Sequence, residues 1–209
     1  MIDEVREYWD GQAARFDEEV DHGLLDPQAR AAWTELLTRT LPPAPAAVVD
    51  LGCGTGSIAV LLAELSYGVR GLDLPGAMVA AARAKAAAAG VPAALQQGAA
   101  ANPPYAAASA DVVVVRHVLW ALPDPAAALA AWMRLLRPAG RLLLVEGSWQ
   151  TGASITAAGC DRLARQVGTY AMVHPLDDPR LWGGPITDER YLLVTSCPPT
   201  RRVLLPPNE

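Results

Sequence analysis

Apolar and polar positions follow two different periods along residues 46–147 of the chain. Short apolar runs predict strands, and the segments between them, whose apolar residues recur at helical spacing, predict helices. Continuously apolar strands that alternate with helices indicate a parallel sheet covered on both faces. We therefore expect an α/β fold, a Rossmann-like doubly wound sheet in three αβα layers. The predicted strands are 46–50, 68–73, 93–97, 111–115 and 141–145, and the predicted helices are 57–65, 77–89 and 124–136.

The pattern changes at both ends of this alternation. Residues 3–19 predict a polar helix, and a second helix begins with the N-cap Asp26 and the first-turn Pro27 and runs to about residue 41. After the last parallel strand we expect a helix, followed by two strands that form an antiparallel hairpin. We predict one domain with cap helices in 1–45, a core in 46–147 and a C-terminal part in 148–209. That last part holds the helix 154–166 and the strands 169–173 and 191–195.

Composition narrows the class of protein. The 209 residues are 52% apolar, which suffices for one sizeable core, and the net charge of −5 without a basic block argues against nucleic-acid binding. The three cysteines and three histidines lie far apart, without metal-ligand spacing. The acidic N-terminus is unlike a signal peptide, and no window has the length of a membrane span. We expect a cytoplasmic protein without metal, nucleic-acid partner or membrane contact.

The stretch VVDLGCGTG at residues 48–56 carries the strongest chemical signal, because an apolar strand ends in a carboxylate and glycines follow at alternate positions. A dinucleotide-binding loop would have its third glycine where Ser57 stands, and a Walker loop would continue with Gly-Lys-Ser/Thr, which this sequence lacks. The next strand ends at Asp73, a carboxylate suited to the two hydroxyls of a ribose. The ligand that fits is a nucleoside without a pyrophosphate, and S-adenosylmethionine is the common one.

With these motifs the chain resembles the class I S-adenosylmethionine-dependent methyltransferases of the small-molecule type. The resemblance starts at the glycine-rich stretch and continues, in the family's order, through Gly71-Leu72-Asp73 with Met78 and the strand that begins Ala110-Asp111. It ends at LLRPAGRLLLVEG, residues 135–147, so it covers about residues 46–147. The stretch YWDGQAARFDEE is similar to the cap helix that often precedes this domain.

The resemblance implies roles for individual residues. Gly52, Gly54 and Gly56 would face the aminocarboxypropyl chain and the ribose of S-adenosylmethionine. Asp73 would bind both ribose hydroxyls, and Asp50 would orient the loop or bind the cofactor's ammonium. Further residues in or beside the cofactor site are Tyr8, Cys53 as a small filler, Leu74 beside the adenine, Met78, Ala99, Ala100 and Arg116.

Two features depart from the family's pattern. Family members often have Gly-Asp-Ala after the third strand, where the aspartate bonds the adenine amino group, but this chain has Gly98-Ala99-Ala100. The loss of one hydrogen bond, about 0.5–1.5 kcal/mol, would weaken cofactor binding without preventing the chemistry. The stretch Asn102-Pro103-Pro104-Tyr105 matches a catalytic tetrapeptide of amino-methylating relatives, but it precedes the fourth strand instead of following it. We interpret it as a proline-rich surface loop.

Two histidines are candidate catalytic residues. Methyl transfer is an in-line displacement whose leaving group needs no proton, although an oxygen or nitrogen nucleophile can still need a base. His117 follows the strand 111–115, at the edge where open α/β sheets bind ligands, and the alternative is a histidine bonded to backbone beside the cofactor. His22 could reach over the site from the cap with Asp21 to orient it, and the alternative is a solvated histidine in a turn.

Candidate acceptor-binding residues come from the same rim and from the ends of the chain. Glu146, one residue past the predicted fifth strand, would face the acceptor or pair with Arg116. Trp9 would close over the site or pack the cap helix, and Trp182 would form a pocket wall or shape the hairpin. Trp120 completes this set.

We predict an S-adenosylmethionine-dependent methyltransferase that acts on an oxygen, nitrogen or carbon of a small metabolite, with specialised metabolism as one setting. One alternative is a protein that binds the cofactor without methyl transfer, as a structural or regulatory subunit or an enzyme that uses only the sulfonium charge. Another is a nucleotide-dependent oxidoreductase on a similar sheet. The predicted fifth and sixth strands lie close in the chain, so the first ~40 residues, and a partner subunit in a homodimer, would cover the pocket.

Overall fold

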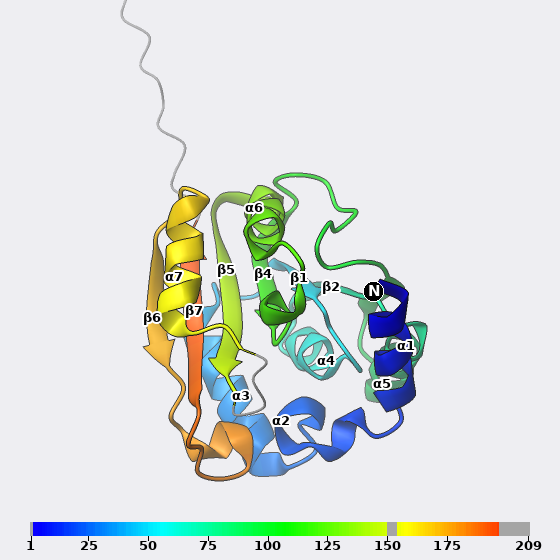
Figure 1. Ribbon diagram of the computed structural model, residues 1–209. Coiled ribbons are helices and arrows are strands. Elements are labelled where there is room, and N and C mark those ends of the chain that lie inside the picture. Colours follow the sequence, from blue (N-terminus) through cyan, green and yellow to red (C-terminus); the bar gives the residue numbers. More distant parts are fainter. Residues whose placement is uncertain (1, 150–153, 197–209) are drawn as a thin grey trace, which may run out of the picture.

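The computed structural model describes residues 2–149 and 154–196, whose strands form one seven-stranded sheet in the order β3-β2-β1-β4-β5-β7-β6 (Figure 1). Strands β1 to β5 are parallel, and β7 runs antiparallel to both β5 and β6. The predicted doubly wound sheet and its C-terminal antiparallel hairpin are therefore confirmed. The strands are β1 Ala47–Leu51, β2 Gly68–Asp73, β3 Ala93–Gln97, β4 Ala110–Arg116, β5 Leu136–Ser148, β6 Ala171–Pro175 and β7 Glu189–Ser196.

Helices cover both faces of the sheet. One face carries α3 (Pro27–Thr40), α4 (Ser57–Glu64) and α5 (Gly76–Ala89), and the other carries α6 (Pro125–Leu135) and α7 (Ala157–Gln166). The chain begins with α1 (Ile2–Gln12), and the short turns are η1 (Phe16–Glu18), α2 (Val20–Gly23), η2 (Leu119–Ala121) and η3 (Pro179–Trp182). Among the residues described, no helix is long and apolar enough to cross a membrane.

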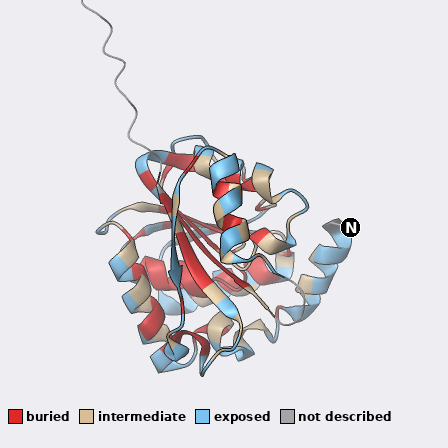
Figure 2. Ribbon diagram, turned by 60° about the vertical axis from the view of Figure 1, so that its left-hand side comes forward, coloured by how far each residue is buried: buried red, intermediate tan, exposed pale blue. Residues whose placement is uncertain are grey.

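The core consists of two apolar layers, one on each side of the sheet. In β1 and β4, Val48 and Val112 pack toward α3 and α4, whereas Val49 and Val113 pack toward α6. All four are completely buried, because strands covered on both faces have no polar side. Figure 2 shows these buried strands enclosed by helices that expose only their outer surfaces.

Several predicted boundaries were wrong, among them those of the first helix and of strands β5 and β6. The first helix ends at Gln12, not at residue 19, and the short turn η1 then brings Phe16 against the glycine loop. Strand β5 spans Leu136–Ser148, because it pairs with β4 on one side and with β7 on the other well beyond the predicted residues 141–145. Strand β6 begins at Ala171, two residues later than predicted.

The cap segment lies under the carboxyl ends of the parallel strands. In Figure 1 the arrowhead of β5 points toward η1, α2 and the η3 turn, which together run along the lower edge of the molecule. Ligands of doubly wound sheets bind at this edge, where neighbouring strands lead to helices on opposite faces. Here β1 lies between β2 and β4, so the topology directs attention to the loops after these three strands.

Candidate functional site

The glycine-rich loop between β1 and α4 has a backbone that only glycine adopts without strain. Gly52, Gly54 and Gly56 have φ angles of +71°, +54° and +81°. A Cβ atom at Gly52 would lie 2.2 Å from Cγ2 of Val118, and one at Gly56 would lie 2.8 Å from the Cβ of Ala82. The loop therefore turns sharply around the end of β1 and leaves no room for side chains at these positions.

Asp73 ends β2 and is tied to the glycine loop. Its Oδ2 accepts a hydrogen bond from the N–H of Gly54 at 2.5 Å, and its Oδ1 accepts one from the N–H of Leu74 at 2.7 Å. Burial raises the pKa of Asp73 to about 6, although the two amide donors act in the opposite direction. The carboxylate is thus held rigidly at the position predicted to bind the ribose.

Asp50 is a buried carboxyl with an unused acceptor. Its side chain is 2% exposed, and its Oδ2 has no hydrogen-bond partner among the described residues. Burial raises the pKa of Asp50 to about 7, and the positive charge of Arg116 only partly offsets this. An orphaned buried acceptor is costly, so this oxygen suits a donor supplied by a ligand, such as the ammonium of an amino-acid moiety.

The N-terminal cap is fastened directly onto the glycine loop, an attachment that was not predicted from the sequence. The ring of Phe16 lies 3.0 Å from the position that a Cβ at Gly54 would take. The carboxylate of the neighbouring Asp17 binds Nζ of Lys85 at 2.8 Å and accepts a hydrogen bond from Oγ1 of Thr55 at 2.5 Å. The stretch FDEE was part of the resemblance, but nothing local in it identified these partners.

The aromatic residues of α1 extend this cap outward. Trp9 meets Phe16 edge to face at 6.0 Å between ring centroids, and Tyr8 meets Trp9 in the same way at 5.1 Å. Tyr8 is 59% exposed, so the ring that packs against the glycine loop is that of Phe16. The cofactor role of Tyr8 and the acceptor role of Trp9 stay predictions.

His117 directly follows β4 in a left-handed backbone conformation, with φ of +58°. Its ring lies nearly parallel to that of Trp182 at 6.2 Å and meets Trp149 edge to face at 4.9 Å. Nε2 is buried and has no hydrogen-bond partner among the described residues. Burial, and then the positive charge of Arg116, lowers the pKa of His117 well below its usual value. At neutral pH the site therefore holds a neutral imidazole, and the same shift makes it a weaker base than an exposed histidine.

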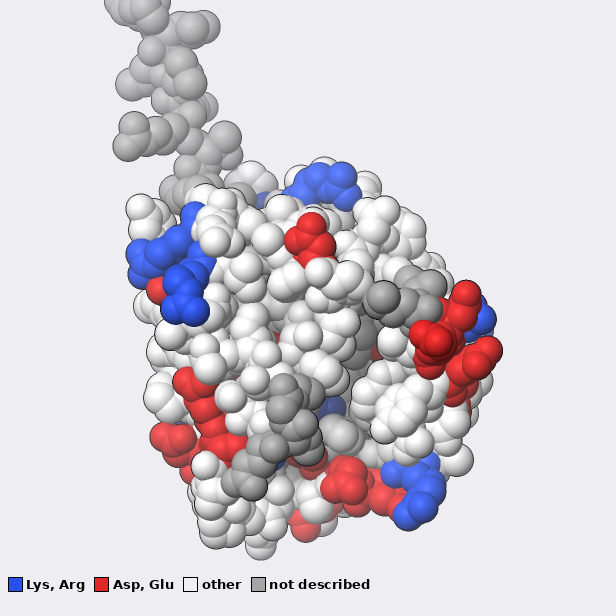
Figure 3. Space-filling view, in the orientation of Figure 1, with Lys and Arg blue, Asp and Glu red and all other residues white. Residues whose placement is uncertain are grey.

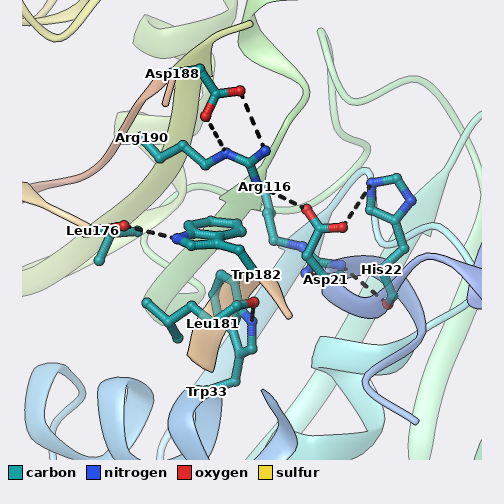
Figure 4. Close-up of polar contacts among 9 residues, drawn as sticks. All are labelled: Asp21, His22, Trp33, Arg116, Leu176, Leu181, Trp182, Asp188 and Arg190. Carbon is teal, nitrogen blue, oxygen red and sulfur yellow. Dashed lines mark hydrogen bonds and ion pairs between the residues drawn. The ribbon is translucent and has the colours of Figure 1, made fainter. Parts of the chain in front are cut away.

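His22 is brought to the same place from the cap. Its ring stacks on Phe16, with centroids 4.3 Å apart and planes 8° from parallel, and its centroid lies 6.2 Å from that of His117. Nε2 lies 3.9 Å from Oδ1 of Asp21, an arrangement visible in Figure 4. Burial lowers the pKa of His22, although the charge of Asp21 opposes this. The two candidate catalytic histidines thus belong to one cluster.

Arg116 holds the backbone of α2 in place beside His22 and His117. Its guanidinium donates hydrogen bonds to the backbone carbonyl oxygens of Asp21 and His22 and lies 5.1 Å above the ring of Trp33 (Figure 4). These contacts fasten α2 to the end of β4. A cofactor contact by Arg116 stays a prediction.

Trp182 forms a wall of the cluster from the η3 turn. It is 9% exposed, and its Nε1 donates to the carbonyl oxygen of Leu176 at 2.8 Å. The guanidinium of Arg190 lies 4.4 Å above its ring and pairs with Asp188 at 3.0 Å and Asp21 at 3.4 Å. The hairpin therefore contributes both an aromatic surface and charge to the site.

The position and the partners of Glu146 differ from those predicted. It lies within β5 instead of after it, and its Oε1 accepts hydrogen bonds from the N–H groups of Val118 at 2.9 Å and Leu119 at 2.6 Å. The suggested partner Arg116 faces α2 instead. Burial raises the pKa of Glu146 to about 8. It therefore acts first as a protonated support for the turn after β4, while its Oε2 is unpartnered among the described residues.

The remaining predicted residues surround these groups. Trp120 donates from Nε1 to the carbonyl oxygen of His117 at 3.1 Å, and its ring lies 6.0 Å from that of Trp149. Met78 is buried in α5, and Ala100 accepts a hydrogen bond from Trp132 through its carbonyl oxygen. The roles predicted for these residues, and for Cys53, Leu74 and Ala99, stay untested by the geometry.

The stretch 102–105 is a loop between β3 and β4, as interpreted from the sequence. The guanidinium of Arg70 lies 4.8 Å above the ring of Tyr105, whose hydroxyl donates to the carbonyl oxygen of Gly71 at 3.4 Å. These contacts give Tyr105 a structural role against β2.

Charged side chains on the face drawn in Figure 3 lie in separate groups. Lysines and arginines form small clusters there, without a continuous basic surface. Acidic side chains gather near the N-terminus, where α1 has Asp3 and Glu4 in its first turn. The predicted lack of a nucleic-acid partner stays a prediction.

Comparison with known proteins shows which family the core of this chain resembles. Residues 49–144, which include the glycine loop, Asp73 and His117, match a family described as a methyltransferase domain. Over these residues the chain is similar to the class I S-adenosylmethionine-dependent methyltransferases. This family's cofactor is S-adenosylmethionine, and the orphaned Oδ2 of Asp50 beside the glycine loop fits its ammonium.

Curated relatives resemble the chain over its core. A ubiquinone biosynthesis O-methyltransferase of Xanthomonas axonopodis pv. citri is 32% identical over 63% of this chain and 56% of its own length. A demethylmenaquinone methyltransferase of Thermus thermophilus is 34% identical over 51% of this chain and 49% of its own. The chain thus spans about half the length of these relatives.

Solved structures share the fold at lower identity. A chain in the complex of the Haloferax volcanii Trm112 methyltransferase activator with its methyltransferase partner aligns with a TM-score of 0.71 and 21% identity, covering 91% of this chain and 97% of that one. The 4+2 cyclase SpnF aligns with a TM-score of 0.71 and 18% identity, over 80% of both chains. These similarities concern the fold alone.

Proposed function

We propose that this chain transfers the methyl group of S-adenosylmethionine to a small organic acceptor, at an oxygen that carries a proton. The observation that carries this choice is the position of His117 directly after β4, where its buried Nε2 is unpartnered among the described residues. A group of this kind can take the proton that the acceptor loses during the reaction. Nitrogen and carbon acceptors are the alternatives that an acceptor screen distinguishes.

The cofactor would lie along the carboxyl edge of β1 and β2. Asp73 would bind the ribose hydroxyls, Asp50 would accept from the ammonium, and the glycine backbone would follow the aminocarboxypropyl chain. When bound, S-adenosylmethionine supplies an activated methyl group on a sulfonium that leaves as a neutral thioether. Phe16 and the cap would exclude water from this place, as its position over Gly54 suggests.

The acceptor would lie between the aromatic rings around His117. Trp149 and Trp182 would hold it, and their packing would align its oxygen for in-line displacement. The bound cofactor would supply the methyl group to that oxygen, and its neutral thioether would be the leaving group. The proton of the oxygen would pass to the imidazole of His117 and later to solvent.

The names of two relatives support a small acceptor. Two of them, the ubiquinone biosynthesis O-methyltransferase and the demethylmenaquinone methyltransferase, are named for quinone-related molecules. Because the chain spans about half of their length, the identity of its own acceptor needs a direct screen.

The test begins with calorimetric binding of S-adenosylmethionine and its demethylated product. We expect Asp73→Ala to weaken both by at least about tenfold, because a charged hydrogen-bond acceptor for the ribose is lost. Asp161→Ala, which removes a carboxylate that pairs with Arg165 on α7, should leave binding unchanged. Methyl transfer from labelled cofactor is then screened over phenols, hydroxy acids and amines.

Each outcome separates one hypothesis from the others. Binding followed by methylation of hydroxyl acceptors supports the proposal. Tight binding without transfer to any acceptor favours the cofactor-binding alternative. Folded wild-type protein that binds neither ligand overturns the proposal.

A further inference from the structure

We infer that Asp21, His22 and His117 form a binding site for a divalent transition-metal ion of the Zn²⁺ class. The proposal concerns ion binding itself and holds whether or not the chain methylates. From the sequence no metal was expected, because the histidines lie far apart in the chain. The fold brings two of the histidines together, since α2 of the cap contacts the turn after β4.

The fold brings together one carboxylate and two imidazoles, which are side chains that bind transition-metal ions. One potential ligand atom from each of Asp21, His22 and His117 lies within 4.8 Å of the others. The separations exceed those in a filled site, so small rotations of the two imidazoles would complete the coordination. Two imidazoles and one carboxylate are ligands that zinc, nickel and copper ions accept.

The nitrogen atoms are also available. Nδ1 of His22 and Nε2 of His117 are buried and lack hydrogen-bond partners among the described residues. Two orphaned ring nitrogens in one cluster are unusual, because buried polar atoms are nearly always paired.

Charged side chains of both signs surround the cluster. Arg190 pairs with Asp21 and Asp188, and Arg116 donates to the backbone carbonyl oxygens of Asp21 and His22. Two aspartates thus partly offset the charges of these two arginines, which a cation bound at the cluster would lie beside. Soft imidazole ligands then favour Zn²⁺ over Mg²⁺, which requires oxygen ligands.

Three protein ligands leave a coordination position open for water or another small ligand. A neutral imidazole has a single nitrogen lone pair, so His117 cannot both coordinate an ion and accept a proton. If the proposed methyl transfer uses His117 as a base, Zn²⁺ therefore inhibits it, and a chelator restores it. This consequence alone rests on the proposed function.

The experiment measures ion binding to chelator-treated protein without cofactor or acceptor. Zn²⁺ binding is followed by calorimetry, Co²⁺ by its visible absorption, and Mg²⁺ serves as the comparison ion. We expect one Zn²⁺ per chain and weaker Mg²⁺ binding. His22→Ala and His117→Asn should each lower the Zn²⁺ affinity by at least about tenfold. His174→Ala is the matched control, since this third histidine is exposed on β6.

Wild-type protein that shows no Zn²⁺ binding overturns the proposal. So does binding that His22→Ala and His117→Asn leave as strong as in wild type, because the ion then lies elsewhere. Circular dichroism and thermal unfolding check that the variants fold, and His22→Gln, which retains a side chain of similar length, replaces His22→Ala if that variant does not. Inactivity of the protein as a methyltransferase would leave this binding result unaffected, so the two proposals fail separately.

Discussion

The carboxylate of Asp17 lies 2.8 Å from Nζ of Lys85, and this ion pair joins the cap to the helix behind the glycine loop. Lys85 also donates to Oγ of Ser57 at 2.7 Å, and Asp17 accepts from Oγ1 of Thr55. One network therefore links three separate segments: the turn η1, the start of α4 and the middle of α5. Cap and cofactor loop should consequently respond together to any change in it.

Removal of this carboxylate should weaken both stability and cofactor binding. Asp17→Ala leaves the ammonium of Lys85, which is 22% exposed, with fewer partners. We expect the free energy of unfolding to fall by about 1–3 kcal/mol. The cofactor dissociation constant should rise several-fold, because Phe16 is no longer held over Gly54. Denaturant unfolding and calorimetry measure the two effects.

A surface ion pair provides the control for this variant. Asp161→Ala breaks the pair with Arg165, whose side chain is 57% exposed, and should cost under about 1 kcal/mol. Equal effects of the two substitutions would contradict a special role for Asp17.

The buried carboxyl of Glu146 should make stability depend on pH. Its pKa is raised from 4.5 in the unfolded chain to about 8 in the folded protein, so the folded state binds more protons between these values. The stabilisation that Glu146 contributes is therefore fully present below about pH 4.5 and is lost as the pH rises through about 8. Asp50 and Asp73 act in the same direction, but their folded pKa values of about 7 and about 6 place their effect at lower pH.

Glu146→Gln isolates this contribution, because the amide keeps an acceptor for the turn after β4 and cannot ionise. Wild type should lose about 1 kcal/mol of unfolding free energy through Glu146 between pH 7 and 8, and the variant should not. Urea unfolding at both pH values measures the difference. The exposed Glu35→Gln should retain the wild-type pH dependence. A Glu146→Gln variant that parallels wild type would show that Glu146 does not change its charge between pH 7 and 8.

His117→Asn should lower kcat for an oxygen acceptor by at least about 100-fold, with little change in cofactor affinity. Asparagine tolerates the left-handed backbone at this position, so the turn should persist. Because the pKa of His117 lies well below its usual value, the wild-type rate should show no loss from protonation of this group between pH 8 and 6.5. Unchanged kcat in the variant would assign His117 a purely structural role.

The parallel core could be predicted from the sequence because its signals are local. Strand β2 begins at Gly68 and ends at Asp73, as predicted, since a buried apolar run leads into a carboxylate and a turn. Elements held by distant partners were harder to delimit. β5 extends to Ser148 because it pairs with β7, and no local pattern of apolar and polar residues predicts that pairing.

The candidate site divides in the same way. The glycine loop and Asp73 were identified from their spacing, because tight turns and strand ends produce recognisable patterns of neighbouring residues. Phe16, Asp17 and Lys85 were not identified, since their contacts join residues far apart in the chain. The support that Glu146 gives to the backbone after β4 was missed for the same reason, as neighbouring strands determine which groups face it.

By itself, the sequence determined the doubly wound sheet, the loop that turns on Gly52, Gly54 and Gly56, and the carboxylate that faces it. Only the tertiary structure decided that His22 and His117 meet beside Trp182. One imidazole comes from the cap, the other from the end of β4 and the indole from the hairpin. Such a meeting depends on how separately folded segments pack, and packing is a property of the whole chain.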